Sequence, residues 1–268
     1  MGVMPRKQKR FLQRLVEEFQ AAGRLTFSVG DLCQRGIERN GALLAAIRRY
    51  AATGAIRRIS PRSDFFIIVP PEFRAMGAPP VEWWLGDYMA HLKTPYYVGL
   101  LSAAALHGSA HFAVMETQVV VPGAMRPLSV GRVRVRFFVK AAVTAAPVET
   151  RSNLWGAVEV STPEATLLDL LRYNRSIERT ALIVGDLAKK CRPADLRKAL
   201  DAANDPPSAQ RLGYLFETSG HDDLAKTIEK WLSSRHLPKV DLSPSGGPAW
   251  EERPKWRLRI NSRIEAVA

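Results

Sequence analysis

Residues 31–69 decide the fold of the N-terminal part of this chain: DLCQRGIERNGALLAAIRRYAATGAIRRISPRSDFFIIV. Residues 31–35 predict a short helix that ends at Gly36, because a glycine lets the chain turn sharply after a helix. Apolar residues then recur with helical spacing over 38–53, and Gly54 ends the pattern. Two helices joined by a glycine turn are typical of a helix-turn-helix.

The flanking segments complete a small domain. Residues 56–59 and 65–69 are rich in β-branched and aromatic side chains, and the polar segment 60–63 between them predicts a hairpin loop. On the N-terminal side, apolar residues at spacings of three and four predict a helix over 7–22, followed by a short strand over 25–29. The pattern predicts a winged helix-turn-helix whose wing is the hairpin.

The charge of the chain indicates its partner. Its 268 residues include 39 Lys or Arg and 26 Asp or Glu, a formal net charge of +13. Residues 1–78 hold fourteen Lys or Arg and six Asp or Glu, so +8 of the excess lies in less than a third of the chain. Such an excess favours nucleic acid as the partner ahead of an anionic membrane. The core needs the apolar face of the first helix, which disfavours membrane binding.

The positions of the basic residues fit double-stranded DNA. Arg39 and Asn40 stand at the expected start of the third helix, the end that enters the major groove in this fold. Arginine binds guanine or phosphate through paired hydrogen bonds, and asparagine binds adenine. In the alternative interpretation, the arginines are only the solvated face of a small helical domain. The candidate DNA-binding residues are Arg35, Arg39, Asn40, Arg48, Arg49, Arg57, Arg58 and Arg62.

Proline residues mark an expected domain boundary. Pro70, Pro71, Pro79 and Pro80 bracket a segment without clear periodicity, which predicts a linker. We therefore expect a winged-helix domain over residues 1–78 and a second domain over 79–268. The expected fold class is α+β, with the winged helix followed by a larger mixed domain that has a small sheet and a helix-rich C-terminal half.

The second domain is expected to begin with helices and strands and to continue with helices. Ser161 is expected to cap one of these helices, with Pro163 in its first turn, Glu164 reaching back to the cap and an end near Tyr173. The other expected helices are 81–92, 96–107, 181–190, 193–203, 209–218 and 224–232. The expected strands are 118–121, 128–139 with a break at 129–131, 155–160 and the terminal 256–261.

Four segments occur in order along the chain: FFIIVP at 65–70, PYYVGLLSAAALHG at 95–108, VSTPEATLLD at 160–169 and QRLGYLFE at 210–217. Together they resemble the AbiEi antitoxin and transcriptional-regulator family of type IV toxin-antitoxin systems. The wing departs from this pattern at Asp64, where many relatives place glycine before an aromatic residue. The resemblance implies a repressor of its own operon that counters a nucleotidyltransferase toxin and need not contact it. As a winged helix, it would bind an operator inverted repeat.

Catalytic motifs are incomplete. Gly108-Ser109 is typical of a nucleotidyltransferase, but the region downstream offers Glu116 without the second carboxylate needed to hold a metal. Asp169, Asp186 and Glu217 could serve a nuclease. However, Asp169 and Glu217 lie in helical patterns, where a solvated face or a cap is expected. We expect no catalytic site, which leaves as alternatives a nucleic-acid-processing enzyme with a winged-helix targeting domain and a plain one-component regulator.

Metal sites and disulfides are not indicated. His107 and His111 have ligand spacing, but Gly108 is expected to end the helix between them. Cys33 and Cys191 are far apart, without a CxxC motif, which is typical of a reducing cytoplasm. We expect no cofactor, no metal, no secretion and no membrane span.

One strand of the second domain carries a distinctive charge pattern. Arg132, Arg134 and Arg136 alternate with apolar residues, so one face of the strand is basic and the other is buried. This pattern is compatible with a solvated strand face or with a second nucleic-acid surface, for RNA or for DNA beside the operator.

Overall fold

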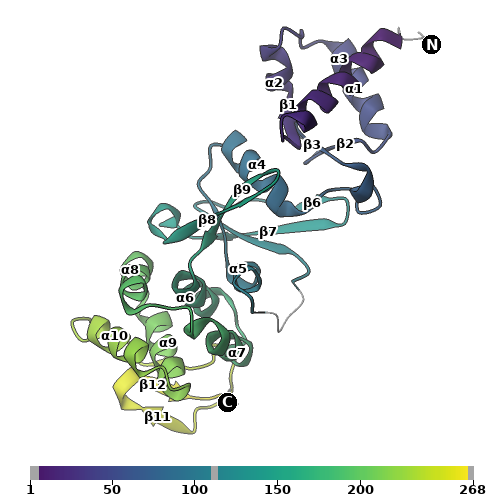
Figure 1. Ribbon diagram of the computed structural model, residues 1–268. Helices are drawn as coiled ribbons and strands as arrows, with labels where there is room; N and C mark the ends of the chain where they lie inside the picture. The colour runs from purple at the N-terminus through teal and green to yellow at the C-terminus, as the bar shows by residue number, and fades with distance from the viewer. Residues whose placement is uncertain (1–5, 110–113, 265–268) are drawn as a thin grey trace. The chain divides into compact units, whose positions relative to one another are not determined.

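The computed structural model describes residues 6–109 and 114–264 (Figure 1). The chain forms two compact units. The first unit comprises Met1–Pro95, Ala124–Phe137 and Thr150–Glu159, and the second comprises Tyr96–Gly123, Phe138–Glu149 and Val160–Ala268. The α+β class is confirmed, since helices and three sheets occur in the described residues. The boundary near residue 78 stays a prediction.

The N-terminal part of the first unit packs its helices on a three-stranded antiparallel sheet with the strand order β1-β3-β2. Phe27 lies at the centre of its core, with ring centroids 5.8 Å from Phe19 and 5.2 Å from Phe66. This arrangement is compatible with a winged helix. The elements are α1 (Arg6–Ala21), β1 (Thr26–Ser28), α2 (Val29–Gln34), α3 (Gly41–Ala52), β2 (Ile56–Arg58) and β3 (Phe65–Ile68).

Polar caps fix where α2 and α3 begin. Ser28 and Asp31 form a reciprocal capping box at the start of α2. Asn40 caps α3, because its side-chain oxygen accepts the backbone N–H of Leu43 at 3.0 Å. The third helix was expected from residue 38, but it begins at Gly41, so Arg39 and Asn40 precede it.

The expected linker is partly buried. After the 3₁₀ turn η1 (Pro71–Phe73), Gly77 and Ala78 are buried. The helix expected over 81–92 is interrupted at Trp84, which separates η2 (Val81–Trp83) from α4 (Leu85–His91). The indole N–H of Trp84 donates to the carbonyl of Pro79 at 3.2 Å, and its ring is buried, so tertiary packing overrides the helical pattern.

Two hairpins contribute their turns and most of their residues to the first unit, over Ala124–Phe137 and Thr150–Glu159. In the first, β6 (Leu128–Val130) pairs antiparallel with β7 (Val133–Val139). A break was expected at 129–131, but Ser129 and Val130 belong to β6 and the strands are separated at Gly131 and Arg132. The second contains β8 (Val148–Asn153), which was not predicted, and β9 (Gly156–Ser161). β8 is polar and exposed at several positions, so its sequence lacks the apolar alternation of a half-buried strand.

The second unit begins with a strand where a helix was expected. Residues 96–107 form β4 (Tyr97–Val98) and then α5 (Leu100–Leu106). β4 pairs antiparallel with β5 (Thr117–Val121) and parallel with β9 at Val98 and Val160. The expectation of a continuous helix was wrong because Tyr97 and Val98 find strand partners on both sides.

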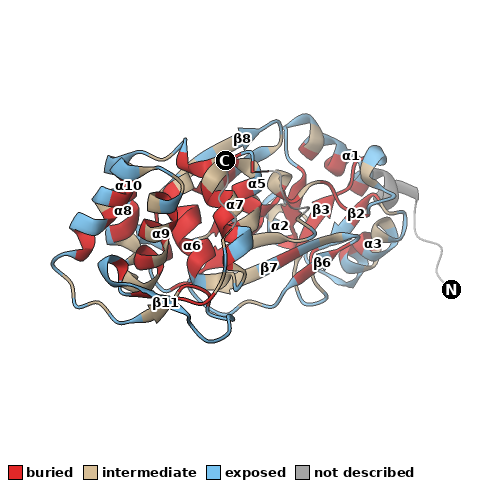
Figure 2. Cartoon of the chain, turned by 90° about the horizontal axis from the view of Figure 1, so that it is seen from below, coloured by how far each residue is buried: buried red, intermediate tan, exposed pale blue. Residues whose placement is uncertain are grey.

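Five helices confirm the helix-rich C-terminal half: α6 (Pro163–Tyr173), α7 (Ile177–Ala188), α8 (Pro193–Ala203), α9 (Pro206–Thr218) and α10 (Asp222–Leu232). Figure 2 shows buried residues along most of α6. The predicted capping of α6 was wrong in detail. Thr162 is the cap, while Ser161 belongs to β9 and is buried. Glu164 does not reach back to the cap, since it accepts the backbone N–H of Arg192 at 2.9 Å.

The C-terminal segment forms the sheet β10-β12-β11 and the 3₁₀ turn η4 (Pro254–Trp256). Its strands are β10 (Val240–Asp241), β11 (Glu251–Arg253) and β12 (Leu258–Ile260), and only β12 was predicted. Trp256 is buried on α9 at Gly213, where a Cβ would lie 2.2 Å from the indole ring. A glycine at this position therefore lets the C-terminal segment pack against the helix.

Candidate nucleic-acid interface

The excess positive charge lies almost entirely in the first unit. This unit holds 20 Lys or Arg and 9 Asp or Glu, a formal charge of +11, whereas the second holds 19 and 17, a charge of +2. The first unit includes the β6–β7 hairpin as well as the N-terminal helices. An anionic partner would therefore be attracted to this unit as a whole.

Arg48 of α3 and Arg58 of β2 lie at the same hollow. Its volume is about 340 Å³. Arg58 extends over the ring of Phe66, with its guanidinium carbon 5.2 Å from the centroid, and donates to the carbonyl of Pro61 at 3.1 Å. These contacts hold its side chain along the hairpin. The hollow is lined by Leu44, Ile47, Arg48, Ala51, Arg58 and Phe66.

Arg35 and Asn40 have polar side-chain partners within the N-terminal part of the first unit. Arg35 forms an ion pair with Glu18 at 3.1 Å, and its guanidinium lies 4.3 Å from the ring centroid of Phe19. Asn40 caps α3, and its amide donates to Glu38 at 3.4 Å. A contact from either side chain to DNA would have to compete with these interactions.

The remaining candidates are exposed. Arg39 lies just before α3, Arg49 on α3, Arg57 on β2 and Arg62 in the loop between β2 and β3. In the parts of the chain that the structure describes, neither Arg39 nor Arg62 has a carboxylate within ion-pair distance. Their guanidinium groups are thus available for an external anion.

The basic strand face is present in β7. Arg132, just before the strand, and Arg134 and Arg136 within it are exposed, while Val135 between them is buried. The expected alternation is therefore observed. The hydrogen bonds from the Arg134 guanidinium to the carbonyls of Gly131 at 2.9 Å and Val133 at 3.2 Å hold that side chain at the hairpin turn.

Asp169 is not on a solvated face, contrary to expectation. Its carboxylate is buried and accepts hydrogen bonds from the Tyr97 hydroxyl at 2.6 Å and the Lys140 ammonium at 2.7 Å. Lys140 also donates to the Tyr97 oxygen at 3.2 Å. Burial, and secondly the neighbouring charge of Asp169, raise the pKa of Tyr97 above its usual value. No local pattern predicts this cluster, because its members are 29 to 72 positions apart.

The other candidate catalytic side chains also have structural partners. His107 is buried, and its Nε2 lies 2.7 Å from the carbonyl of Ser161, whereas His111 lies outside the described residues. Glu217 accepts from Lys255 and from the indole of Trp256, both at 2.6 Å. Partial burial would raise the pKa of Glu217, but these two hydrogen bonds together with the positive charges of Lys255 and Arg253 lower the pKa. Within residues 6–109 and 114–264, no three His, Cys, Asp or Glu side chains are placed to share a metal ion.

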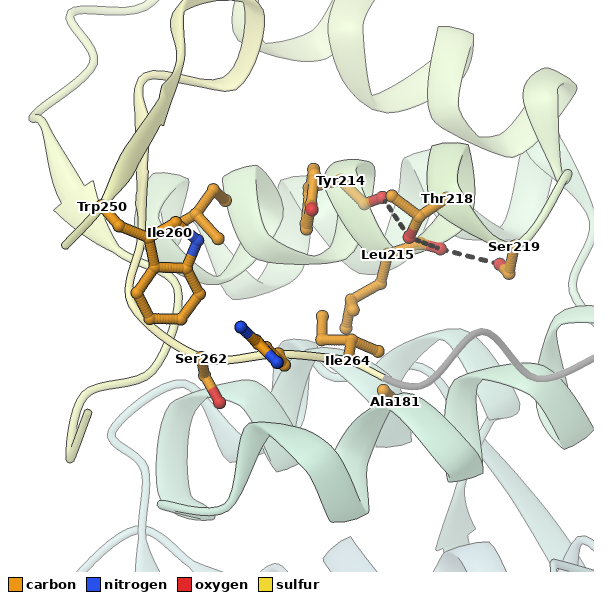
Figure 3. Close-up of a pocket in the computed structure, with 10 residues that line it drawn as sticks. Ala181, Tyr214, Leu215, Thr218, Ser219, Trp250, Ile260, Ser262 and Ile264 are labelled. Atoms are coloured by element: carbon orange, nitrogen blue, oxygen red, sulfur yellow. Dashed lines mark hydrogen bonds between the residues drawn. The ribbon is translucent and has the colours of Figure 1, made fainter. Parts of the chain in front are cut away.

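A second hollow, of about 290 Å³, lies in the second unit between α7, α9 and the C-terminal segment (Figure 3). Trp250, Tyr214 and Ile264 give it a largely apolar lining. Arg263 is the one charged residue among the described residues that line it. The described residues that line this hollow therefore include no acid–base pair.

The comparisons with known proteins show what parts of the chain are similar to. Residues 97–218 match the family model of the AbiEi antitoxin C-terminal domain, which confirms the resemblance over this segment. The chain is also similar to the crystal structure of the RV2827C protein from Mycobacterium tuberculosis. The TM-score is 0.63 at 20% identity, over 92% of this chain and 90% of that chain, and this likeness concerns the fold alone. No curated protein sequence matches the chain. Within the described residues, no helix has the length and apolar character needed to span a membrane.

Proposed function

We propose that this chain, whose residues 97–218 match the family model of the AbiEi antitoxin C-terminal domain, is a DNA-binding autorepressor and antitoxin. In this proposal it represses its own operon and counters a nucleotidyltransferase toxin as a binding protein without catalytic activity. The observation that carries the DNA-binding part is the concentration of +11 of the formal charge in the first unit, where the N-terminal helices and sheet lie.

We assign the N-terminal elements to a winged helix. The helices α1, α2 and α3 and the sheet order β1-β3-β2 support this assignment. In this assignment α3 enters the major groove and the β2–β3 hairpin is the wing, which contacts the phosphate backbone. A helix that enters the groove reads base edges, while contacts to phosphates position the protein without reading sequence.

The exposed arginines divide into two roles. Arg39 and Arg48, at and along α3, are proposed to face the groove together with Arg49. Arg57, Arg58 and Arg62 are proposed to bind phosphates from the wing. The capping role of Asn40 and the ion pair of Arg35 support a positioning role for these two residues, which hold α3 and α2 in place.

Binding to duplex DNA tests the first part of the proposal. We expect the full-length protein to bind a duplex containing its own promoter, with an operator inverted repeat, more tightly than a scrambled duplex. If six to eight phosphates are neutralised, log K should fall against log salt with a slope of roughly −5 to −7. A flat salt response would contradict the electrostatic argument.

Growth of cells tests the second part. The proposal requires a nucleotidyltransferase toxin gene beside the gene of this protein, and cells that express such a toxin should grow when the protein is co-expressed. Repression without growth rescue would indicate a plain one-component regulator. Metal-dependent processing of DNA or tRNA by the purified chain would instead indicate an enzyme.

The division into residues 1–78 and 79–268 is also a proposal. If the second segment folds by itself, it should retain growth rescue and lose specific DNA binding. Circular dichroism of the isolated segment decides whether it folds, and full promoter binding by this segment would contradict the division.

A further inference from the structure

The β6–β7 hairpin turns at Gly131, and this turn lies against the segment that follows β3. The backbone N–H of Arg132 donates to the carbonyl of Met76 at 2.8 Å. Gly131 has a φ of +60°, and a Cβ there would lie 2.3 Å from the Met76 oxygen and 2.7 Å from the Gly77 Cα. Only a residue without a side chain fits such an approach.

Gly77, on the opposite backbone, also has no room for a side chain. Its φ is +80°, and a Cβ there would lie 2.9 Å from the Gly131 Cα. Two backbones therefore touch, although 54 positions separate the two glycines in the sequence. This junction fixes the hairpin turn to the segment that leaves the β1-β3-β2 sheet.

Arginines from both sides of the junction are close to it. The guanidinium of Arg57, from β2, lies beside Gly77, with Nη2 3.5 Å from the position of a Cβ there. The guanidinium of Arg134 is held at Gly131 by its hydrogen bonds to Gly131 and Val133. Arg57, Arg132 and Arg134 are exposed, and in the described parts of the chain none of them has a carboxylate within ion-pair distance.

We propose that the β6–β7 hairpin is a second DNA-binding wing, which binds the phosphate backbone of the duplex beside the operator. The proposal rests on the proposed function and names a further contact of the same protein with the same partner. The continuity of the positive charge from β2 across the Gly77–Gly131 junction favours duplex DNA over a separate RNA or toxin surface. Because phosphate contacts carry no sequence information, the second wing increases affinity and footprint length without changing sequence preference.

The test compares two duplexes with the full-length protein. One contains the operator alone, and the other extends it by one helical turn on each side. The variant Arg132→Gln/Arg134→Gln removes two charges from the second wing. The matched control Lys226→Gln/Lys230→Gln removes two exposed charges from α10 in the second unit. Circular dichroism and thermal unfolding check that both variants are folded.

We expect wild type to bind the extended duplex more tightly than the short one, and the second-wing variant to lose this difference. Its salt slope on the extended duplex should become shallower by about 1.8, since each lost phosphate contact removes about 0.9. The α10 control should behave as wild type. The order of preference among operator variants should not change.

Three outcomes overturn the inference. If the second-wing variant keeps wild-type affinity and slope on the extended duplex, the arginines are only a solvated strand face. If it keeps duplex binding but loses binding to single-stranded RNA, the hairpin is an RNA surface. If it keeps duplex binding but loses growth rescue, it is a toxin-related surface. Failure of the proposed function is distinct, because wild type would then bind neither duplex specifically.

Discussion

Lys140 and Asp169 form an ion pair of 2.7 Å in which both side chains are buried. The pair joins the residue that follows β7 to the middle of α6, and the Tyr97 hydroxyl from β4 completes it. Burying two charges is costly unless each is paired and hydrogen-bonded, and here the three side chains satisfy one another. The cluster therefore fixes the position of β4 against α6 within the second unit.

Removal of one partner should destabilise the fold strongly. Asp169→Leu leaves the Lys140 ammonium buried without its counter-charge, which should lower the free energy of unfolding by about 3–5 kcal/mol. The double variant Lys140→Met/Asp169→Leu should recover most of this loss, because neither charge is then buried. Urea unfolding of wild type, the single variant and the double variant measures these differences in the free energy of unfolding. Equal losses in the single and double variants would show that the ion pair is not the source of the effect.

The stability of the protein should fall at high pH through Tyr97. Burial and the Asp169 charge raise the pKa of Tyr97, while an unfolded tyrosine loses its proton near pH ~10. The folded state therefore binds more protons than the unfolded state above that pH. The contribution of protonated Tyr97 to the free energy of unfolding is therefore complete below pH ~10 and declines as the pH rises further.

Comparison with Tyr97→Phe isolates this contribution. The variant should be less stable at neutral pH, because Asp169 loses a hydrogen bond. Its free energy of unfolding should nevertheless decline less steeply than that of wild type above pH ~10. Parallel pH profiles for the two proteins would contradict the role assigned to Tyr97.

Asn40 should matter for stability more than for base recognition. Asn40→Ala removes the cap of α3 and should cost about 1 kcal/mol in the free energy of unfolding. Asn40→Ser keeps a capping oxygen and should be near wild type in both stability and operator preference. A loss of adenine preference in a stable Asn40→Ser protein would restore the base-reading role.

Substitution of Arg39 should change the sequence preference of DNA binding, whereas substitution of Arg62 should change the affinity for all sequences. Arg39→Ala should relax sequence preference by roughly 1–3 kcal/mol if this side chain contacts a base edge. Arg62→Ala should weaken binding to all sequences alike, because a wing contacts phosphates. Titration of each variant against a panel of operator substitutions measures both effects. The reverse pattern would exchange the roles of α3 and the hairpin.

Local patterns in the sequence determined most of the helices. The α8 helix occupies 193–203 as expected, and α6 ends at Tyr173 as expected, because proline starts and apolar spacing act within one element. The alternation of Arg132, Arg134 and Arg136 likewise determined which face of β7 is exposed. The concentration of positive charge near the N-terminus is a property of composition and needed no structure.

Only the tertiary structure decided which distant residues meet. Tyr97, Lys140 and Asp169 lie in separate elements, and a local pattern holds no information about which faces pack together. The same reason hid the approach of Gly77 to Gly131, which adds the β6–β7 hairpin to the basic N-terminal unit. Periodicity predicts an element from its own residues, whereas burial of a charge or contact between two backbones depends on partners that only the folded chain brings together.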